Sequence, residues 1–317
     1  MKKDKNEVEK MVIMAHDYYE KNMSQVQIAK ELGLSRPTVS RLLKCALKEK
    51  IVKIEVLDPY RLNQKLATSL CACLGLTNAI VISGQSPSTE IIRRNIAYAA
   101  ANYLQKVIQP GDVVGIGWGR TMKEVANYMK PTHTKDVLFI PLLGGVGQVD
   151  STFQSHSILE TISSAFGAKW IQFHMPAMVE NRKLREGLLE LPDAKQVVQY
   201  WGEMTKAVIG IGVAPFEDQF LFYDYIGEIE RIQLSKGGAV GDICIRFFDI
   251  NGNPIKYINQ ESISVDLKIL KKVKVVIGVA GGKEKIQAII GASRGKYINC
   301  LITDEFTALH ILEYLKV

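Results

Sequence analysis

The stretch that decides the N-terminal fold is residues 25–43, QVQIAKELGLSRPTVSRLL. Apolar residues recur at helical spacing before Gly33 and again after Ser35, which predicts two helices separated by a turn. Ser24 and Ser35 precede the two helices as N-caps, and Gly33 can adopt the positive φ of a tight turn. Pro37 falls in the first turn of the second helix, where its missing N–H costs nothing. The stretch therefore predicts a helix-turn-helix.

The flanking residues extend this prediction on both sides. Apolar residues between positions 6 and 20 recur at helical spacing and predict a preceding helix. Apolar and polar residues alternate from 51 to 56, as in a short wing strand, and Asp58-Pro59 ends it because proline stops a strand ladder. We therefore predict a winged helix-turn-helix over residues 1–58 and a second domain over residues 59–317.

Positive charge is concentrated around the predicted helix-turn-helix. In residues 1–57, 12 lysines and arginines oppose 8 acidic residues, a net +4 out of the chain's +7. Such a basic face attracts a polyanion by counterion release, arginine can bind guanine edges, and hydroxyls reach bases or phosphates. A surface helix pair with solvated charges is the alternative. We expect contacts to double-stranded operator DNA from Ser35, Arg36, Thr38, Ser40, Arg41 and Lys44.

Length and composition exclude several classes of protein. The 317 residues are 47% hydrophobic and 23% charged, as in an ordinary globular protein with a small and a large domain. No stretch is apolar enough for a membrane helix, and the lysine-rich start lacks the apolar core of a signal peptide. We therefore expect a cytoplasmic protein with no membrane partner. Five cysteines without a CxxC pair, and five histidines without HxxxH spacing, predict reduced thiols and no metal site.

From Arg61 onward, short apolar runs alternate with helical patterns. The alternation is typical of an α/β fold with a Rossmann-like, doubly wound, mostly parallel sheet covered on both faces. The expected strands are residues 79–82, 113–116, 137–141, 170–174, 207–211, 275–279 and 299–303. The expected helices are residues 91–107, 122–129, 157–166, 194–204, 285–291 and 305–316. Ligands bind such sheets outside the carboxyl ends of the strands, so the loops there are candidate sites.

The first candidate loop follows the strand predicted at residues 113–116. It contains Gly117, Trp118, Gly119, Arg120 and Thr121. Glycines let the backbone approach a phosphate, and N–H groups at a helix start point toward it. A purely structural turn between strand and helix is the alternative. A dinucleotide is less favoured because the next strand ends in Ile140-Pro141 and not in an acidic residue.

The second candidate loop contains Gly144 and Gly145 and leads to Gln154, whose amide suits sugar hydroxyls. A flexible turn is the alternative for these residues. Further along the chain, Asp242 and Arg246 lie four residues apart, close enough to share a site or to pair with each other.

The third candidate loop contains Gly281, Gly282 and Lys285 and precedes another predicted helix. It lacks the GxxxxGK[ST] pattern of a nucleotide-hydrolysing P-loop, which makes ATP hydrolysis improbable. Its two lysines, Lys283 and Lys285, suit a phosphate, although an exposed lysine is more often only solvated.

Together these motifs resemble the SorC family of bacterial sugar-responsive transcriptional regulators, which includes sorbitol-operon and deoxyribonucleoside regulators. The resemblance covers essentially the full chain. It is carried by residues 25–43, the glycine loop of residues 113–122, Gly144-Gly145, residues 239–242 with 247–249, and residues 280–282 with Lys285. It implies a DNA-binding regulator of a carbohydrate-catabolism operon, not an enzyme and without a cofactor. Its larger domain would look like sugar-phosphate isomerases, bind a phosphorylated sugar and form dimers or tetramers.

The resemblance also implies roles for individual residues. The phosphate would contact Gly117, Gly119, Arg120, Thr121 and Lys285, and the sugar would contact Gln154, Asp242 and Arg246. This sequence has Leu143 where some members have a lysine that forms a Schiff base, or an arginine that serves a second phosphate. Because Leu143 can serve neither purpose, the resemblance implies a monophosphorylated effector that is held without a covalent bond.

Two other functions stay open at this point. A sugar-phosphate isomerase or deaminase with an attached DNA-binding domain would need a positioned base, for which Asp242 and Asp150 are the candidates. A dinucleotide redox sensor would depend on the glycine loop at residues 115–119 alone.

Overall fold

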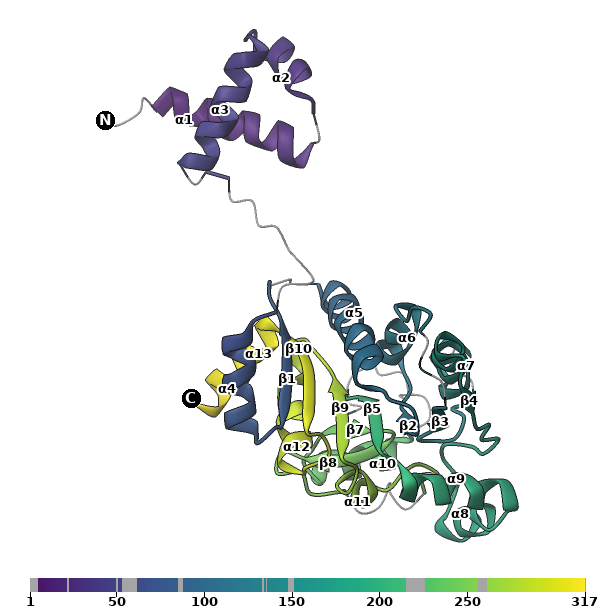
Figure 1. Ribbon diagram of the computed structural model, residues 1–317. Coiled ribbons are helices and arrows are strands. Elements are labelled where there is room, and N and C mark those ends of the chain that lie inside the picture. The colour runs from purple at the N-terminus through teal and green to yellow at the C-terminus, as the bar shows by residue number, and fades with distance from the viewer. Residues whose placement is uncertain are drawn as a thin grey trace. The chain divides into compact units, whose positions relative to one another are not determined.

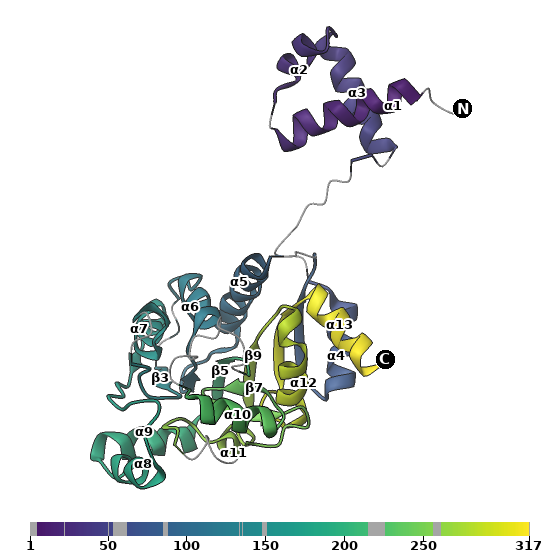
Figure 2. The same ribbon diagram turned by 180° about the vertical axis from the view of Figure 1, so that it is seen from behind.

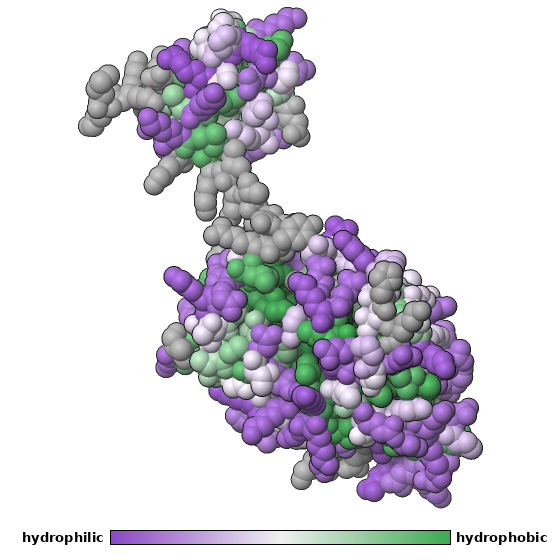
Figure 3. All heavy atoms as spheres, in the orientation of Figure 1, coloured by the Kyte–Doolittle hydropathy of each residue, from purple (hydrophilic) through white to green (hydrophobic). Residues whose placement is uncertain are grey.

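The computed structural model describes residues 5–21, 23–49, 51–52, 62–84, 88–132, 134, 136–147, 151–214, 226–255 and 261–316. Its contacts divide the chain into two compact units, residues 1–57 and 58–317. The first unit is helical and the second has a sheet with helices on both faces (Figures 1 and 2). Hydrophilic residues cover most of the visible surface of each, and hydrophobic residues form separate patches (Figure 3). Among the described residues, no helix is long and apolar enough to cross a membrane.

The first unit contains the predicted helix-turn-helix. Its helices are α1 (Lys5–Ala15), continued by the π-helical turn His16–Glu20, α2 (Gln25–Glu31) and α3 (Arg36–Lys48). Ser24 and Gln27 form a reciprocal capping box at α2, and Ser35 caps α3 by accepting from the Thr38 N–H at 3.3 Å. Gly33 has a φ of +63° in the turn. The predicted helices and both serine caps are confirmed.

The apolar faces of these helices form a separate small core. It consists of Met11, Met14, Ile28, Ala29, Val39, Leu42, Leu43 and Ala46. The first unit therefore buries an apolar core of its own.

The wing strand predicted for residues 51–56 is wrong at its start. Ile51 and Val52 form a bend, and both of their N–H groups donate to the Ala46 carbonyl, at 2.9 and 3.2 Å. These bonds close the C-terminal end of α3 and use the donors that a strand ladder would need. Residues 53–56 lie outside the described part of the chain.

The second unit is built on a seven-stranded sheet in which every described pair is parallel. In spatial order the strands are β1 (Asn78–Ile82), β10 (Cys300–Asp304), β9 (Val275–Val279), β5 (Lys206–Gly210), β2 (Val113–Ile116), β3 (Leu138–Pro141) and β4 (Lys169–Trp170). From β2 the chain winds outward through β3 to β4, and from β5 it winds the other way through β9 to β10. The winding therefore reverses between β2 and β5, and the predicted α/β fold is confirmed.

Helices cover both faces of this sheet (Figures 1 and 2). One face packs against α5 (Thr89–Val107), α6 (Arg120–Asn127) and α7 (Ser155–Phe166). The other packs against α4 (Gln64–Leu74), α9 (Pro192–Glu203), α12 (Ile286–Arg294) and α13 (Glu305–Leu315). The alanines of α5 are part of the first of these cores, with Ala97, Ala100 and Ala101 fully buried against the sheet side.

Several elements of the second unit were not predicted from the sequence. The main one is a small antiparallel sheet of β6 (Gly212–Val213), β7 (Ala239–Ile243) and β8 (Arg246–Asp249). The others are α4, α8 (Arg182–Leu189), α10 (Glu228–Lys236), α11 (Leu267–Leu270) and the 3₁₀ turns Ser151–Phe153 and Lys283–Lys285. The strand predicted at 170–174 is only the two-residue edge strand β4.

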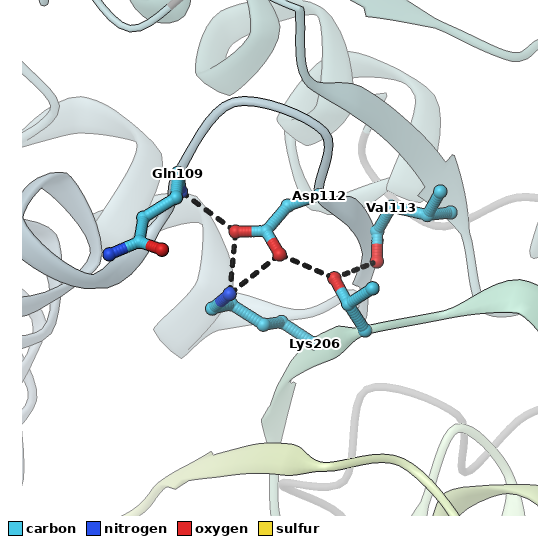
Figure 4. Close-up of polar contacts among 5 residues, drawn as sticks. Gln109, Asp112, Val113 and Lys206 are labelled. Atoms are coloured by element: carbon cyan, nitrogen blue, oxygen red, sulfur yellow. Dashed lines mark hydrogen bonds and ion pairs between the residues drawn. The ribbon is translucent and has the colours of Figure 1, made fainter.

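A buried ion pair joins β2 to β5 at their amino ends (Figure 4). Asp112 immediately precedes β2, and its two carboxylate oxygens lie 2.6 and 2.5 Å from the Nζ of Lys206, the first residue of β5. The Thr205 hydroxyl and the Gln109 N–H also donate to this carboxylate, at 2.6 and 2.7 Å. Burial alone would raise the pKa of Asp112, but these hydrogen bonds and the lysine charge lower it below 3.8.

We predict that Asp112→Asn lowers the free energy of unfolding by about 3 kcal/mol at pH 7, because it leaves the lysine charge buried without its partner. The native pKa of Asp112 is below the unfolded value, so this stabilisation is complete above about pH 4 and disappears as the pH falls through the native pKa. Urea titrations of both proteins at pH 7 and pH 2.5 measure it. Glu190→Gln, in the exposed Glu190–Lys195 pair, is the control and should change stability by less than about 0.5 kcal/mol. An equal loss at both pH values would contradict the assignment.

Candidate functional site

A cavity of about 800 Å³ lies at the carboxyl ends of β2, β5 and β9, beside the point where the winding reverses. Its walls come from the start of α5, the loop into α6, the loop after β5, the strand β7 and the loop from β9 toward α12. Seven residues predicted from the sequence line it: Trp118, Gly119, Arg120, Thr121, Asp242, Gly281 and Lys285. The structure thus brings together the first and third candidate loops.

The loop into α6 is formed for close approach to a ligand. Gly119 has a φ of +96°, which favours glycine, and no side chain caps the start of α6. Arg120 and Thr121 occupy the first turn of this helix, at the positive end of its dipole, and both line the cavity. An anion here would meet a helix start, a hydroxyl and a guanidinium.

Gly117 serves packing within the same loop. Its N–H donates to the Val208 carbonyl at 2.8 Å, and a Cβ on it would lie 3.3 Å from the Ile209 Cα. The glycine therefore lets β2 approach β5, and it does not line the cavity.

Asp242 and Lys285 form the opposite wall. The Asp242 carboxyl is buried against Gly212, whose Cα leaves no room for a side chain, and it accepts from the Ile245 N–H at 3.0 Å. Burial raises the pKa of Asp242 to about 6, opposed by this hydrogen bond and by the charge of Lys285. Burial also lowers the pKa of Lys285, whose Nζ donates to the Ile211 carbonyl at 2.9 Å.

One wall of the cavity, the start of α5, was not predicted from the sequence. Thr89, Glu90 and Arg93 line the cavity there. Burial and then the neighbouring charge of Arg93 lower the pKa of Arg120, while Glu284 opposes them. The available signal was topological: α5 follows the carboxyl end of β1, the same edge of the sheet as the other loops.

The predicted residues of the second candidate loop do not line the cavity. The Gly145 N–H donates to the Met175 carbonyl at 2.7 Å, and a Cβ on Gly144 would overlap the carbonyls of Met175 and Pro176. The Gln154 amide accepts from the Val146 N–H at 2.9 Å and donates to the Val146 carbonyl. Gly144, Gly145 and Gln154 therefore hold backbone segments together, and Asp150 lies outside the described residues.

The expectation that Asp242 and Arg246 share a site is wrong. In the β7–β8 hairpin Asp242 is opposite Phe247 and Arg246 is opposite Ile243, so the two side chains point to opposite faces. Arg246 donates from Nη2 to the carbonyls of Ser262 and Ser264, at 3.1 and 2.8 Å, outside the cavity lining. Gly282 likewise does not line the cavity.

The outer face of α3 is basic and accessible. Arg36, Arg41 and Lys44 are exposed, and Thr38 and Ser40 are half-buried. The Ser35 hydroxyl lies 2.8 Å from that of Thr38, so both hydroxyls belong to the helix cap as well as to this face. The opposite face of α3 is in the core. This arrangement fits a recognition helix of a DNA-binding unit.

Known proteins share both units. The Sugar-bind family, a sugar-binding domain, matches residues 58–313, and region 4 of sigma-70 factors matches residues 6–49. The sorbitol operon regulator of Klebsiella pneumoniae is 31% identical over 97% of this chain and 99% of its own length. The deoxyribonucleoside regulator of Bacillus subtilis is 33% identical over 96% and 97%. The crystal structure of full-length SorC from K. pneumoniae aligns with a TM-score of 0.76 over 98% of this chain and 100% of that one.

A helix-turn-helix joined to a sugar-binding α/β unit defines a DNA-binding transcriptional regulator, and the relatives carry that function in their names and no enzymatic one. The chain belongs to the SorC family of sugar-responsive transcriptional regulators.

We predict that replacing Arg36 and Arg41 together by Ala weakens binding to a DNA duplex selected by the full chain from a random-sequence pool. If each arginine neutralises one phosphate, the slope of log affinity against log salt falls by about 2. Fluorescence anisotropy at several salt concentrations measures both quantities. Arg182→Ala removes an equally exposed arginine from α8 and should change neither. An unchanged affinity and slope in the double variant would show that α3 does not contact DNA.

We predict that Asp242→Asn removes a pH dependence of stability while keeping the acceptor for the Ile245 N–H. The native pKa of about 6 exceeds the unfolded value of 3.8, so the carboxyl's contribution is complete below about pH 4 and is lost as the pH rises through 6. Relative to the wild type, the variant should gain about 2 kcal/mol of unfolding free energy between pH 4 and pH 8. Urea titrations across this range measure the gain, with the exposed Asp193→Asn as control. A pH-independent difference would contradict burial of this carboxyl.

Proposed function

We propose that this regulator controls a carbohydrate-catabolism operon and that its effector is a monophosphorylated sugar, bound reversibly in the cavity described above. The observation that supports this most directly is the set of three cationic side chains at the starts of three helical segments around one cavity. These are Arg93 in α5, Arg120 in α6 and Lys285 in the turn before α12. A phosphate monoester carries nearly two negative charges near pH 7 and offers three acceptor oxygens, which such a set can bind.

Three carboxylates, those of Glu90, Asp242 and Glu284, line the cavity beside the three cationic side chains. Among the described carboxylates of the cavity, Glu90 pairs with Arg94 at 3.8 Å, and none forms an ion pair with Arg93. Burial lowers the pKa of Lys285 most, the charges of Asp242 and Glu284 raise it, and the charges of Arg120 and Arg93 lower it. A bound phosphate would relieve this mutual repulsion. Asp242, on the opposite wall, is available to accept hydrogen bonds from sugar hydroxyls once it is ionised.

Reversible binding is supported by position 143. Leu143 is fully buried, pairs with Ser264 and does not line the cavity. It supplies neither an amine for a Schiff base nor a charge for a second phosphate. The proposal therefore includes one phosphate group and no covalent step.

The proposal extends to assembly and location. A dimer would place two α3 helices in successive major grooves of a two-fold symmetric operator, and a tetramer would combine two such dimers. The protein would act in the cytoplasm, where its DNA target is. Sedimentation velocity of the full chain with and without DNA tests the subunit number.

We predict that one sugar phosphate among glucose 6-phosphate, ribose 5-phosphate and 2-deoxyribose 5-phosphate stabilises the full chain, whereas the same sugar without phosphate does not. At 100 times its dissociation constant, a ligand adds about 2.7 kcal/mol and raises Tm by several degrees. Differential scanning calorimetry measures the shift.

Lys285→Met should weaken this binding at least about tenfold through loss of a charge-assisted hydrogen bond to phosphate. Lys283→Met, in the same turn but outside the cavity lining, is the matched control and should bind normally. A response to NADH, an equal response to the unphosphorylated sugar, or none to any phosphate would overturn the proposed effector.

A further inference from the structure

We propose that a hydrogen-bonded network through Glu305 couples the cavity to Asn63, the residue at which the chain coming from the DNA-binding unit enters the α/β unit. The inference rests on the proposed function, because the effector is what would act on the cavity end of the network. The side chains that form the network, those of Asn63, Asp304, Glu305 and Thr307, are not part of the cavity lining or of α3.

The entry point, Leu62 and Asn63, is hydrogen-bonded to β1. Leu62 and Asn63 are the first residues described after position 52, and Leu62 forms an antiparallel bridge with Ile82. The Asn63 N–H donates to the Val81 carbonyl at 2.7 Å. Its side-chain oxygen also caps α4 by accepting from the Leu66 N–H at 3.2 Å. The chain is therefore held here by backbone and side chain together.

One carboxylate joins this entry point to the segment between β1 and α5. Glu305, the first residue of α13, accepts from Asn63 Nδ2 at Oε1 over 3.3 Å. Its Oε2 accepts from the Gly84 N–H at 2.7 Å. Each oxygen thus holds a different segment, so a movement of Glu305 acts on both. Beyond Gly84 the chain continues to α5, whose start lines the cavity.

A second, buried set of hydrogen bonds connects the start of α13 to the cavity loop. Asp304 caps α13, accepting from the Thr307 N–H at 3.0 Å and from the Thr307 hydroxyl at 2.5 Å. The same hydroxyl accepts from the Gly282 N–H at 2.7 Å. Gly281, which immediately precedes Gly282, lines the cavity, and a Cβ on it would overlap the Asp304 carboxylate. The cavity loop and the start of α13 are therefore in direct contact.

Burial makes this set act as a unit. Asp304 is 4% exposed and Thr307 is fully buried, so breaking any of these bonds would leave a polar group without water to replace it. A ligand that displaces the loop at Gly281 must carry Asp304 and Thr307 with it, and Glu305 is covalently next to Asp304. The displacement then reaches Asn63 through the Glu305 carboxylate.

Two substitutions break only the Asn63–Glu305 link. Asn63→Asp keeps an acceptor for the Leu66 N–H, and aspartate is as good an N-cap as asparagine, but it places a carboxylate against Glu305. Glu305→Gln keeps an acceptor for the Gly84 N–H and turns an amide donor toward the Asn63 donor. Combining them restores a hydrogen bond of reversed polarity, since the introduced amide donates to the introduced carboxylate. Glu313→Gln, exposed at the far end of α13, is the matched control.

The experiment measures the dissociation constant for the selected DNA duplex, with and without whichever of the three sugar phosphates binds the wild type. We expect the sugar phosphate to change this constant at least about fivefold in the wild type and the control, the usual lower range of allosteric coupling. Each single variant should respond less than about twofold, and the double variant should recover. Calorimetry without DNA should show that all four variants still bind the sugar phosphate.

The outcomes are distinguishable. Full responses in both single variants would overturn the coupling and leave the proposed function intact. A response lost in the single variants and not recovered in the double variant would also overturn it, because damage and not the link would then explain the loss. Binding of none of the phosphates by the wild type would overturn the proposed function and the coupling with it.

Discussion

The pairing of β2 with β5 is the constraint on which the rest of the second unit depends. The chain winds outward in opposite directions from these two neighbours, so the connections that leave their carboxyl ends diverge and leave space between them. At the amino ends the Asp112–Lys206 pair fixes the same two strands (Figure 4). The ion pair holds the amino ends of β2 and β5 together, whereas the diverging connections leave space between their carboxyl ends. Glycines at positions 117 and 210 follow from this geometry, since Gly117 lies against the Ile209 backbone and Gly210 lines the cavity.

The cavity is built from groups that a purely structural core would avoid. Asp242, Lys285 and Arg120 have pKa values displaced first of all by burial, and such groups raise the free energy of the native state unless a ligand or partner compensates for it. Cys244 and Ile245 adopt φ angles of +50° and +63°, unfavourable for a β-branched residue, in the turn that holds Asp242. This turn brings the Ile245 N–H within hydrogen-bond distance of the Asp242 carboxylate. Displaced charges and backbone strain therefore coincide in one place, as they do at functional sites.

Sequence reasoning succeeded where one residue type has one physical explanation. The serines predicted as N-caps at positions 24 and 35 do cap α2 and α3, and the apolar runs at 113–116 and 275–279 match β2 and β9 residue for residue. It failed where one residue type serves two purposes. A glycine after a strand can adopt a positive φ beside a cavity, as at Gly119, or permit the approach of another backbone, as at Gly144 beside Pro176. The small sheet could not be predicted because β6 has only two residues and is defined entirely by its partner β7.

The start of α5 shows why the remaining wall of the cavity was not visible in the sequence. Arg93 lies within an ordinary amphipathic helix, and only the arrangement of the sheet brings this helix start near those of α6 and α12. The same arrangement places the cavity and the first described residues of the α/β unit, Leu62 and Asn63, at the same edge of the sheet. Parallel strands direct all their carboxyl ends to one edge, and the chain enters the unit beside β1 at that edge. Hydrogen bonds through Thr307, Asp304 and Glu305 therefore connect the cavity loop to the entry point along this one edge of the sheet. The position of the cavity and the entry point at one edge is therefore a consequence of the fold.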